Sequence, residues 1–176
     1  MTEKSEIRKE VRRRIAEMSQ QQRNDAAESI FARIETSERF ARARCIALYA
    51  SLPDEVPTYD VIGRWSADKR IVLPRVEGEI MRFYDYDPRT ISRGSFGIDE
   101  PEAAEECPPS QIDMIVIPAR AFTPSGVRLG RGKGFYDRYM SLPDFRAYKI
   151  GVAFRCQIFD ALPFEDHDIK ADETLF

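Results

Sequence analysis

Helical segments alternate with short apolar runs along most of the chain, and this alternation restricts the possible fold more than any other feature of the sequence. Residues 3–18 carry apolar side chains at helical spacing, and residues 19–22 have the Ser-x-x-Gln pattern of a capping box that starts a second helix. Apolar runs at residues 45–50 and 114–117 have the length of buried strands. We therefore expect an α/β sandwich with a largely parallel sheet.

The remaining segments extend this α/β pattern. A helix is expected from Pro57 to about Ala67, with proline at its first position. Further strands are expected at 70–73, 81–86, 149–154 and 174–176, a further helix from about Phe135, and mostly loop at 88–110 and 118–134. The length of 176 residues suits one domain spanning residues 1–176.

Charge and cysteine content narrow the possible partners and the compartment. The chain has 27 Lys and Arg against 30 Asp and Glu, which gives no reason to expect nucleic acid or an anionic membrane as a partner. Its N-terminus is too charged for a signal peptide, and no apolar run approaches the roughly 20 residues of a membrane span. The three cysteines are far apart and form no C-x-x-C motif, which indicates free thiols. We expect a cytoplasmic protein, and a monomer.

A glycine-rich basic loop at residues 128–137 carries the strongest functional signal. Parallel sheets bind ligands at the carboxyl ends of their strands, and this loop follows the apolar run 114–117. Its alternate glycines let the backbone approach an anion, the helix after it adds partial positive charge, and Arg128, Arg131 and Lys133 supply cations. A flexible basic surface loop is the alternative, but it would not need the Phe-Tyr-Asp that follows. We predict a phosphate site.

Two familiar phosphate motifs do not fit this loop. Gly134 stands where a Walker A loop has Ser or Thr, and the glycine spacing differs from the dinucleotide fingerprint. Asp137 is open to two interpretations, either an ion-pair partner of the nearby cations or a ligand of Mg²⁺, which prefers hard oxygen atoms and bridges to phosphates.

The loop and a series of other segments resemble the 5-formyltetrahydrofolate cyclo-ligase family. The signature R-L-G-R-G-K-G-F-Y-D-R covers residues 128–138, and further landmarks follow in the family's order at 4–8, 49–58, 73–75, 96–101, 113–118, 157 and 163–168. The resemblance implies a three-layer α/β/α sandwich with a mostly parallel sheet, related to ribose-phosphate isomerases and CoA transferases. Phe96, Thr123 and Phe135 depart from common family residues, and we expect them to affect the shape of the pocket without changing the reaction class.

The resemblance also implies the reaction. Family enzymes convert 5-formyltetrahydrofolate to 5,10-methenyltetrahydrofolate with ATP and Mg²⁺, releasing ADP and phosphate. The formyl oxygen attacks the γ-phosphate of ATP, N10 then closes on the phosphorylated carbon, and phosphate departs. The basic loop, a helix N-terminus and Mg²⁺ suit the charge that develops on the transferring phosphoryl group.

Site residues follow from the same resemblance. The ATP site is expected to comprise Lys4, Ser5, Glu6, Ile7, Arg8, Arg128, Leu129, Gly130, Arg131, Gly132, Lys133, Gly134, Phe135 and Tyr136. The substrate site is expected to comprise Ala50, Glu55, Met81, Phe96 and Tyr136, with Phe83 as a further apolar wall. Catalytic roles fall to Lys133, Arg131 and Tyr136, and the Mg²⁺ ligands are Asp137 and Asp168.

The residues by themselves leave alternatives open at several of these positions. Lys4 lies inside the apolar arc of its own helix, which suggests a function, but it could also sit in a frayed first turn. Glu55 taken alone is an exposed turn carboxylate, although a carboxylate also suits the N–H groups of a pterin. Met81 and Phe83 could be ordinary core, Tyr136 could only pack at the helix start, and Asp168 could be an acidic tail residue. His167 is assigned no role.

Two other classes of protein compete with this interpretation. A sugar-phosphate isomerase of the same architecture would need no ATP and would leave the Lys4/Arg8 pair unexplained. A nucleotide- or RNA-binding module would need a broad basic face, whereas residues 99–106 are rich in acids. Product formation only with 5-formyltetrahydrofolate, ATP and Mg²⁺ together would distinguish the three.

Overall fold

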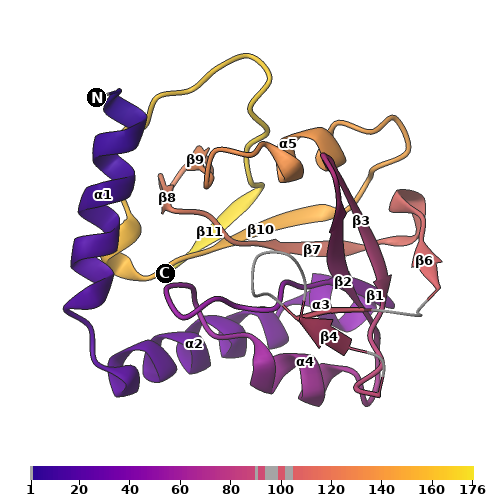
Figure 1. Cartoon of the computed structure of the whole chain (residues 1–176). Helices are drawn as coiled ribbons and strands as arrows, with labels where there is room; N and C mark the ends of the chain where they lie inside the picture. The colour runs from indigo at the N-terminus through magenta and orange to yellow at the C-terminus, as the bar shows by residue number, and fades with distance from the viewer. Residues whose placement is uncertain (1, 90, 94–98, 102–104) are drawn as a thin grey trace.

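A seven-stranded sheet with the order β11-β10-β7-β1-β2-β3-β6 runs through the centre of the molecule (Figure 1). The computed structural model describes residues 2–89, 91–93, 99–101 and 105–176. The strands from β11 to β2 are parallel to one another, whereas β3 pairs antiparallel with β2 and β6 pairs antiparallel with β3. The strands are β1 Cys45–Ala47, β2 Arg70–Glu77, β3 Ile80–Asp85, β6 Glu106–Cys107, β7 Met114–Ile117, β10 Tyr148–Val152 and β11 Glu173–Leu175. The expected mostly parallel sheet is confirmed.

Helices cover both faces of this sheet, which gives the expected three layers. They are α1 Glu3–Ala16, α2 Gln20–Glu35, α3 Glu38–Arg42, α4 Tyr59–Trp65 and α5 Phe135–Met140. Side chains alternate along β7, where Met114 and Val116 pack into the core beneath α1, α2 and α4, and Ile115 and Ile117 pack into the core with α5. β7 is therefore buried on both faces, which explains why it is an uninterrupted apolar run.

The first two helices form as their sequences predict. Val11 and Ile15 of α1 are buried, and α2 buries Ala27, Ile30, Phe31 and Ile34. The capping box is present, because the Ser19 hydroxyl accepts from the Gln22 N–H and the Gln22 side chain accepts from the Ser19 N–H. The first helix ends at Ala16 rather than at residue 18.

Several boundaries and short elements differ from the expectations. β1 is shorter than the apolar run 45–50, and α4 begins at Tyr59 rather than at Pro57. The Thr58 hydroxyl donates to the Tyr49 carbonyl and does not cap the helix. β2 and β10 also differ from their expected ranges, and the supposed loops contain β4 Ile91–Arg93, β5 Asp99–Pro101, β6, a 3₁₀ turn Pro109–Gln111, β8 Ala121–Phe122 and β9 Arg128–Leu129. Such short elements, like α3, carry no detectable periodicity in the sequence.

The topology brings the two predicted connections together. β1 pairs with β2 on one side and with β7 on the other. From β1 the chain continues through α4 to β2 and returns to the other side of β1 only with β7. This is the switch point of the sheet, where open α/β sheets form a crevice at the carboxyl ends of the strands. The turn after β1 and the glycine-rich loop after β7 therefore share one end of the sheet. Within the described part of the chain, none of the helices has the length and apolar character that crossing a bilayer requires.

Candidate active site at the carboxyl ends of β1 and β7

The glycine-rich loop is a built turn rather than a flexible segment. β8 and β9 pair as a short hairpin, and the chain then passes through Gly132 and Gly134, whose φ angles are 105° and 69°, before α5 begins. Left-handed backbone of this kind favours glycine. Arg8 of α1 crosses over the loop and donates from Nε to the Gly130 carbonyl at 2.9 Å. Helix α1 therefore fixes the loop from the side.

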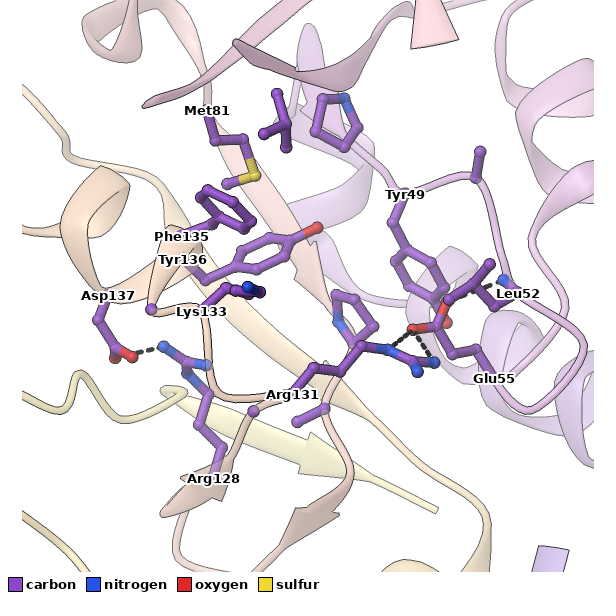
Figure 2. A pocket seen from close by; sticks show the side chains of 17 residues that line it. Tyr49, Leu52, Glu55, Met81, Arg128, Arg131, Lys133, Phe135, Tyr136 and Asp137 are labelled. Atoms are coloured by element: carbon purple, nitrogen blue, oxygen red, sulfur yellow. Dashed lines mark hydrogen bonds and ion pairs between the residues drawn. The ribbon is translucent and has the colours of Figure 1, made fainter. Parts of the chain in front are cut away.

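An apolar cavity of about 390 Å³ lies between the loop and the turn after β1 (Figure 2). Its lining residues are Tyr49, Ala50, Leu52, Glu55, Pro74, Val76, Met81, Pro118, Ala119, Arg128, Gly130, Arg131, Lys133, Gly134, Phe135, Tyr136 and Asp137. Ala50, Glu55, Met81 and Tyr136, four of the predicted substrate residues, are among them. A cavity of this size, mostly apolar with a few polar groups, is the usual form of a small-molecule site.

Glu55 is the buried carboxylate of this apolar cavity. Its Oε2 accepts from the Leu52 N–H at 2.9 Å, and its Oε1 accepts from Nε and Nη2 of Arg131 at 3.1 and 2.9 Å (Figure 2). The exposed turn carboxylate, which was the alternative for Glu55, is therefore not what the fold produces. Arg131 reaches across from the glycine-rich loop to hold it.

Two tyrosines present hydroxyl groups near Glu55. Burial raises the pKa of Tyr136, and the nearby Glu55 carboxylate adds to the rise, so its hydroxyl stays protonated. Burial also raises the pKa of Tyr49, whose hydroxyl donates to the Val56 carbonyl at 2.8 Å. Tyr136 is thus a neutral hydrogen-bond donor at the wall of the apolar cavity, whereas Tyr49 is committed to the backbone. The sequence interpretation did not single out Tyr49.

A polar cavity of about 670 Å³ adjoins the apolar one on the other side of the loop. Its lining residues are Lys4, Arg8, Arg128, Leu129, Gly130, Gly132, Lys133, Gly134, Asp137, Arg138, Ser141, Asp166, His167, Asp168 and Ile169. Arg128, Gly130, Lys133, Gly134 and Asp137 line both cavities. The glycine-rich loop is therefore the wall between the apolar cavity and the polar cavity.

The two predicted metal ligands lie at the polar cavity and already have partners in the protein. Oδ1 of Asp137 accepts from the buried Arg128 guanidinium and from the Ile169 N–H at 2.9 Å. Oδ2 of Asp168 accepts from the Glu165 N–H at 2.9 Å and lies 3.9 Å from Nζ of Lys4. Among the described residues, no group of three or more His, Cys, Asp or Glu is placed to hold a metal. Two carboxylates at a phosphate site still fit Mg²⁺, which takes one or two carboxylates and completes its shell with water and substrate phosphates.

Lys4 and Arg8 reach the polar cavity, whereas their neighbours on α1 do not. Lys4 pairs with Glu165, and this hydrogen bond lowers the pKa of the Glu165 carboxyl. Ser5 donates to the Thr2 carbonyl, Glu6 is exposed and Ile7 packs on the core, so these three lie outside both cavities. The first turn is ordered by its ion pair rather than frayed.

Other predicted positions lie away from both cavities or outside the described structure. Phe83 is fully buried core and not a cavity wall. Thr123, which was expected to affect the shape of the pocket, lines neither cavity, and its hydroxyl accepts from the Val127 N–H at 3.0 Å inside the β8–β9 turn. Phe96 lies outside the described residues. His167, by contrast, is exposed at the rim of the polar cavity, with its Nε2 3.6 Å from Oδ1 of Asp168.

Comparison with known proteins points to one family. The sequence model of the 5-formyltetrahydrofolate cyclo-ligase family matches residues 1–176. The chain is 31% identical to the 5-formyltetrahydrofolate cyclo-ligase of Escherichia coli (strain K12), over 90% of this chain and 92% of that one. It is 28% identical to a probable 5-formyltetrahydrofolate cyclo-ligase of Caenorhabditis elegans, over 98% and 92%. The solution structure of Aquifex aeolicus 5,10-methenyltetrahydrofolate synthetase superposes with a TM-score of 0.89 at 33% identity, covering 99% of this chain and 89% of that one.

Proposed function

The chain belongs to the 5-formyltetrahydrofolate cyclo-ligase family, and we propose that it uses ATP and Mg²⁺ to convert 5-formyltetrahydrofolate to 5,10-methenyltetrahydrofolate, releasing ADP and phosphate. The conversion itself follows from family membership. We propose in addition that ATP is the co-substrate, that Mg²⁺ is required, that the site residues have the roles given below, and that the protein acts as a cytoplasmic monomer.

The observation that carries this proposal is the single loop shared by two cavities of opposite character. The apolar cavity suits the reduced pterin, whose N–H groups find an acceptor in Glu55. The polar cavity suits a triphosphate, because the glycine-rich backbone and the side chains of Lys4, Arg8 and Lys133 surround it. The formyl oxygen and the γ-phosphate would then meet at the loop, which places the reacting groups close together.

The proposed roles follow from where each side chain lies. Lys133 lines both cavities and stabilises the charge on the phosphoryl group as it passes from ATP to the formyl oxygen. Arg131 supports the same charge from the side of the apolar cavity, and the protonated Tyr136 hydroxyl orients the substrate. N10 then attacks the activated carbon and loses its proton, and phosphate leaves with the former formyl oxygen. Asp137 and Asp168 would hold Mg²⁺, which would neutralise charge on the phosphates.

The deciding experiment measures methenyl product spectroscopically with the three components present singly, in pairs and together. We expect product only with 5-formyltetrahydrofolate, ATP and Mg²⁺ together, with ADP and phosphate formed in equal amounts. Product without ATP would contradict the proposed phosphorylation. ADP formed at the same rate without folate would identify an ATPase instead.

A further inference from the structure

A chain of alternating charges extends from the apolar cavity into the protein interior. Glu55 holds Arg131, Nη2 of Arg131 also donates to Oδ1 of Asp54 at 2.6 Å, and Oδ2 of Asp54 pairs with Nη1 of Arg120. Asp54 and Arg120 line neither of the two cavities. The outer pair of this chain is therefore not part of the ligand-binding walls, and its role needs a separate explanation.

Arg120 is the fixed end of the chain of charges. It lies between β7 and β8, its N–H donates to the Leu129 carbonyl at 2.8 Å, and its carbonyl accepts from Nε2 of the buried Gln157 at 3.0 Å. Its side chain is 9% exposed, against 35% for Arg131. A buried guanidinium needs a charged partner, so Arg120 fixes the position of Asp54.

The turn that carries Asp54 is held from a second direction as well. Arg23 of α2 donates from Nη1 to the Pro53 carbonyl and from Nη2 to the Ile15 carbonyl, both at 2.9 Å. Hydrogen bonds from Arg131 and Arg120 outweigh the effect of burial and lower the pKa of Asp54, so its carboxylate stays ionised. Asp54 is thus an ionised acceptor at a fixed position, aimed at Arg131.

We propose that Arg120, acting through Asp54, is a positioning residue that keeps the Arg131 guanidinium at the wall of the apolar cavity when substrate occupies Glu55. The inference rests on the proposed function. If the pterin N–H groups take over Glu55, Arg131 loses both bonds to that carboxylate, while the bond to Asp54 remains. Arg131 then has one fixed anchor, and its other nitrogens are available to the transferring phosphoryl group. Without Arg120, the backbone of the turn is still held by Arg23, but the Asp54 carboxylate loses its buried partner and holds Arg131 less firmly.

A double-mutant cycle on kcat tests whether Arg120 acts through Arg131. We expect Arg120→Met to lower kcat about tenfold in the parent protein, but by less than about twofold when Arg131→Met is already present, since coupled residues are not additive. Equal losses in both backgrounds would overturn the proposal. Arg70→Met is the matched control, because Arg70 pairs with Asp85 at 2.6 Å and lines neither cavity. A loss in the control as large as that in Arg120→Met would also overturn it.

Asp54→Asn keeps the test valid if Arg120→Met does not fold. This change preserves the side-chain volume and one acceptor oxygen for Arg120, and it weakens the hold on Arg131. We expect the same pattern, a fall in kcat that disappears in the Arg131→Met background. Arg120→Lys retains the charge, and we expect it to keep more of the parent kcat than Arg120→Met does. An unchanged kcat in Asp54→Asn would contradict the role of the pair.

A measurement on the ligand-free protein separates this inference from the proposed function. Glu55→Ala removes both bonds from Glu55 and leaves Asp54 as the partner of Arg131. In this background, nuclear magnetic resonance of the Arg131 guanidinium N–H groups should show slower exchange with water than when Asp54→Asn or Arg120→Met is added. An unchanged Arg131 signal in both variants would overturn the positioning role even in an active enzyme. A parent protein that forms no methenyl product would overturn the proposed function, and the Arg131 signal would still decide whether Arg120 positions that residue.

Discussion

Replacing Glu55 by glutamine tests the folate half of the site most directly. Both Glu55 oxygens accept from donors, Oε1 from Arg131 and Oε2 from the Leu52 N–H. A glutamine offers one oxygen and one NH₂ group, so one of these donors must face another donor. A buried group left without its hydrogen bond costs about 1–3 kcal/mol, and we expect the free energy of unfolding to fall by that amount.

The effect on folate binding should be larger than the effect on ATP binding. Hydrogen bonds to a charged group contribute about 1.5–3 kcal/mol, so folate affinity should fall roughly tenfold to a hundredfold. ATP affinity should change little, because the polar cavity does not include Glu55. Calorimetric titration of each ligand into the parent and the Glu55→Gln protein measures both affinities, and urea denaturation measures stability.

Glu35→Gln is the matched control for this experiment. The Glu35 carboxylate also accepts from an arginine, Arg64, and from a second N–H, Nε1 of Trp65 at 2.7 Å, but it lines neither cavity. Both donors meet the same oxygen, Oε1, so a glutamine still offers them an acceptor. We therefore expect Glu35→Gln to lose less stability than Glu55→Gln and no affinity for either ligand. Loss of ATP binding with folate binding preserved in Glu55→Gln would reverse the assignment of the two cavities. A parent protein that binds no folate would refute the reasoning altogether.

Four further predictions concern the loop, the ion, the sheet and helix α4. Lys133→Ala should abolish most turnover and weaken ATP binding while changing the free energy of unfolding by no more than about 0.5 kcal/mol, and wild-type kinetics would remove the loop from the site. Asp137→Asn should raise the Mg²⁺ concentration needed for half-maximal rate, and identical Mg²⁺ titrations would leave Asp137 as a structural ion-pair partner. Gly151→Ala should destabilise the fold by about 1–3 kcal/mol in chemical denaturation, because the added Cβ would lie 2.4 Å from the buried Phe122 ring. Gly63→Ala in helix α4 should instead raise the free energy of unfolding by about 0.5–1 kcal/mol, because a Cβ added there meets no atom within 4 Å.

The sequence predicted the sheet and the place of the site because both depend on local patterns. Val11 and Ile15 repeat at helical spacing, and the run 114–117 is apolar throughout because both faces of β7 are covered. The glycines of the loop predict a backbone that turns through left-handed conformations, and Gly132 and Gly134 do have positive φ angles. These signals need no knowledge of distant contacts.

Features that depend on pairing across the chain could not be predicted in the same way. Arg120 and Asp54 are 66 positions apart, and Arg131 and Glu55 are 76 apart, so nothing in their local sequence joins them. The β8–β9 hairpin has two residues in each strand and leaves no periodic trace. The available signal for the outer ion pair was a single charged residue, Arg120, within the otherwise apolar segment 114–122.

The same long-range pairing shows how one loop serves two cavities. Arg128 and Arg131 point to opposite sides of the loop, the first bound to Asp137 and the Ile169 carbonyl and the second bound to Asp54 and Glu55 (Figure 2). Within the part of the chain that the structure describes, the Lys133 ammonium group has no hydrogen-bond or ion-pair partner. Because Lys133 also lines both cavities, it is the loop cation whose charge remains available to a phosphoryl group that crosses from one cavity to the other. Loss of the Lys133 side chain should therefore reduce turnover more than removal of the partners of Arg128 or Arg131.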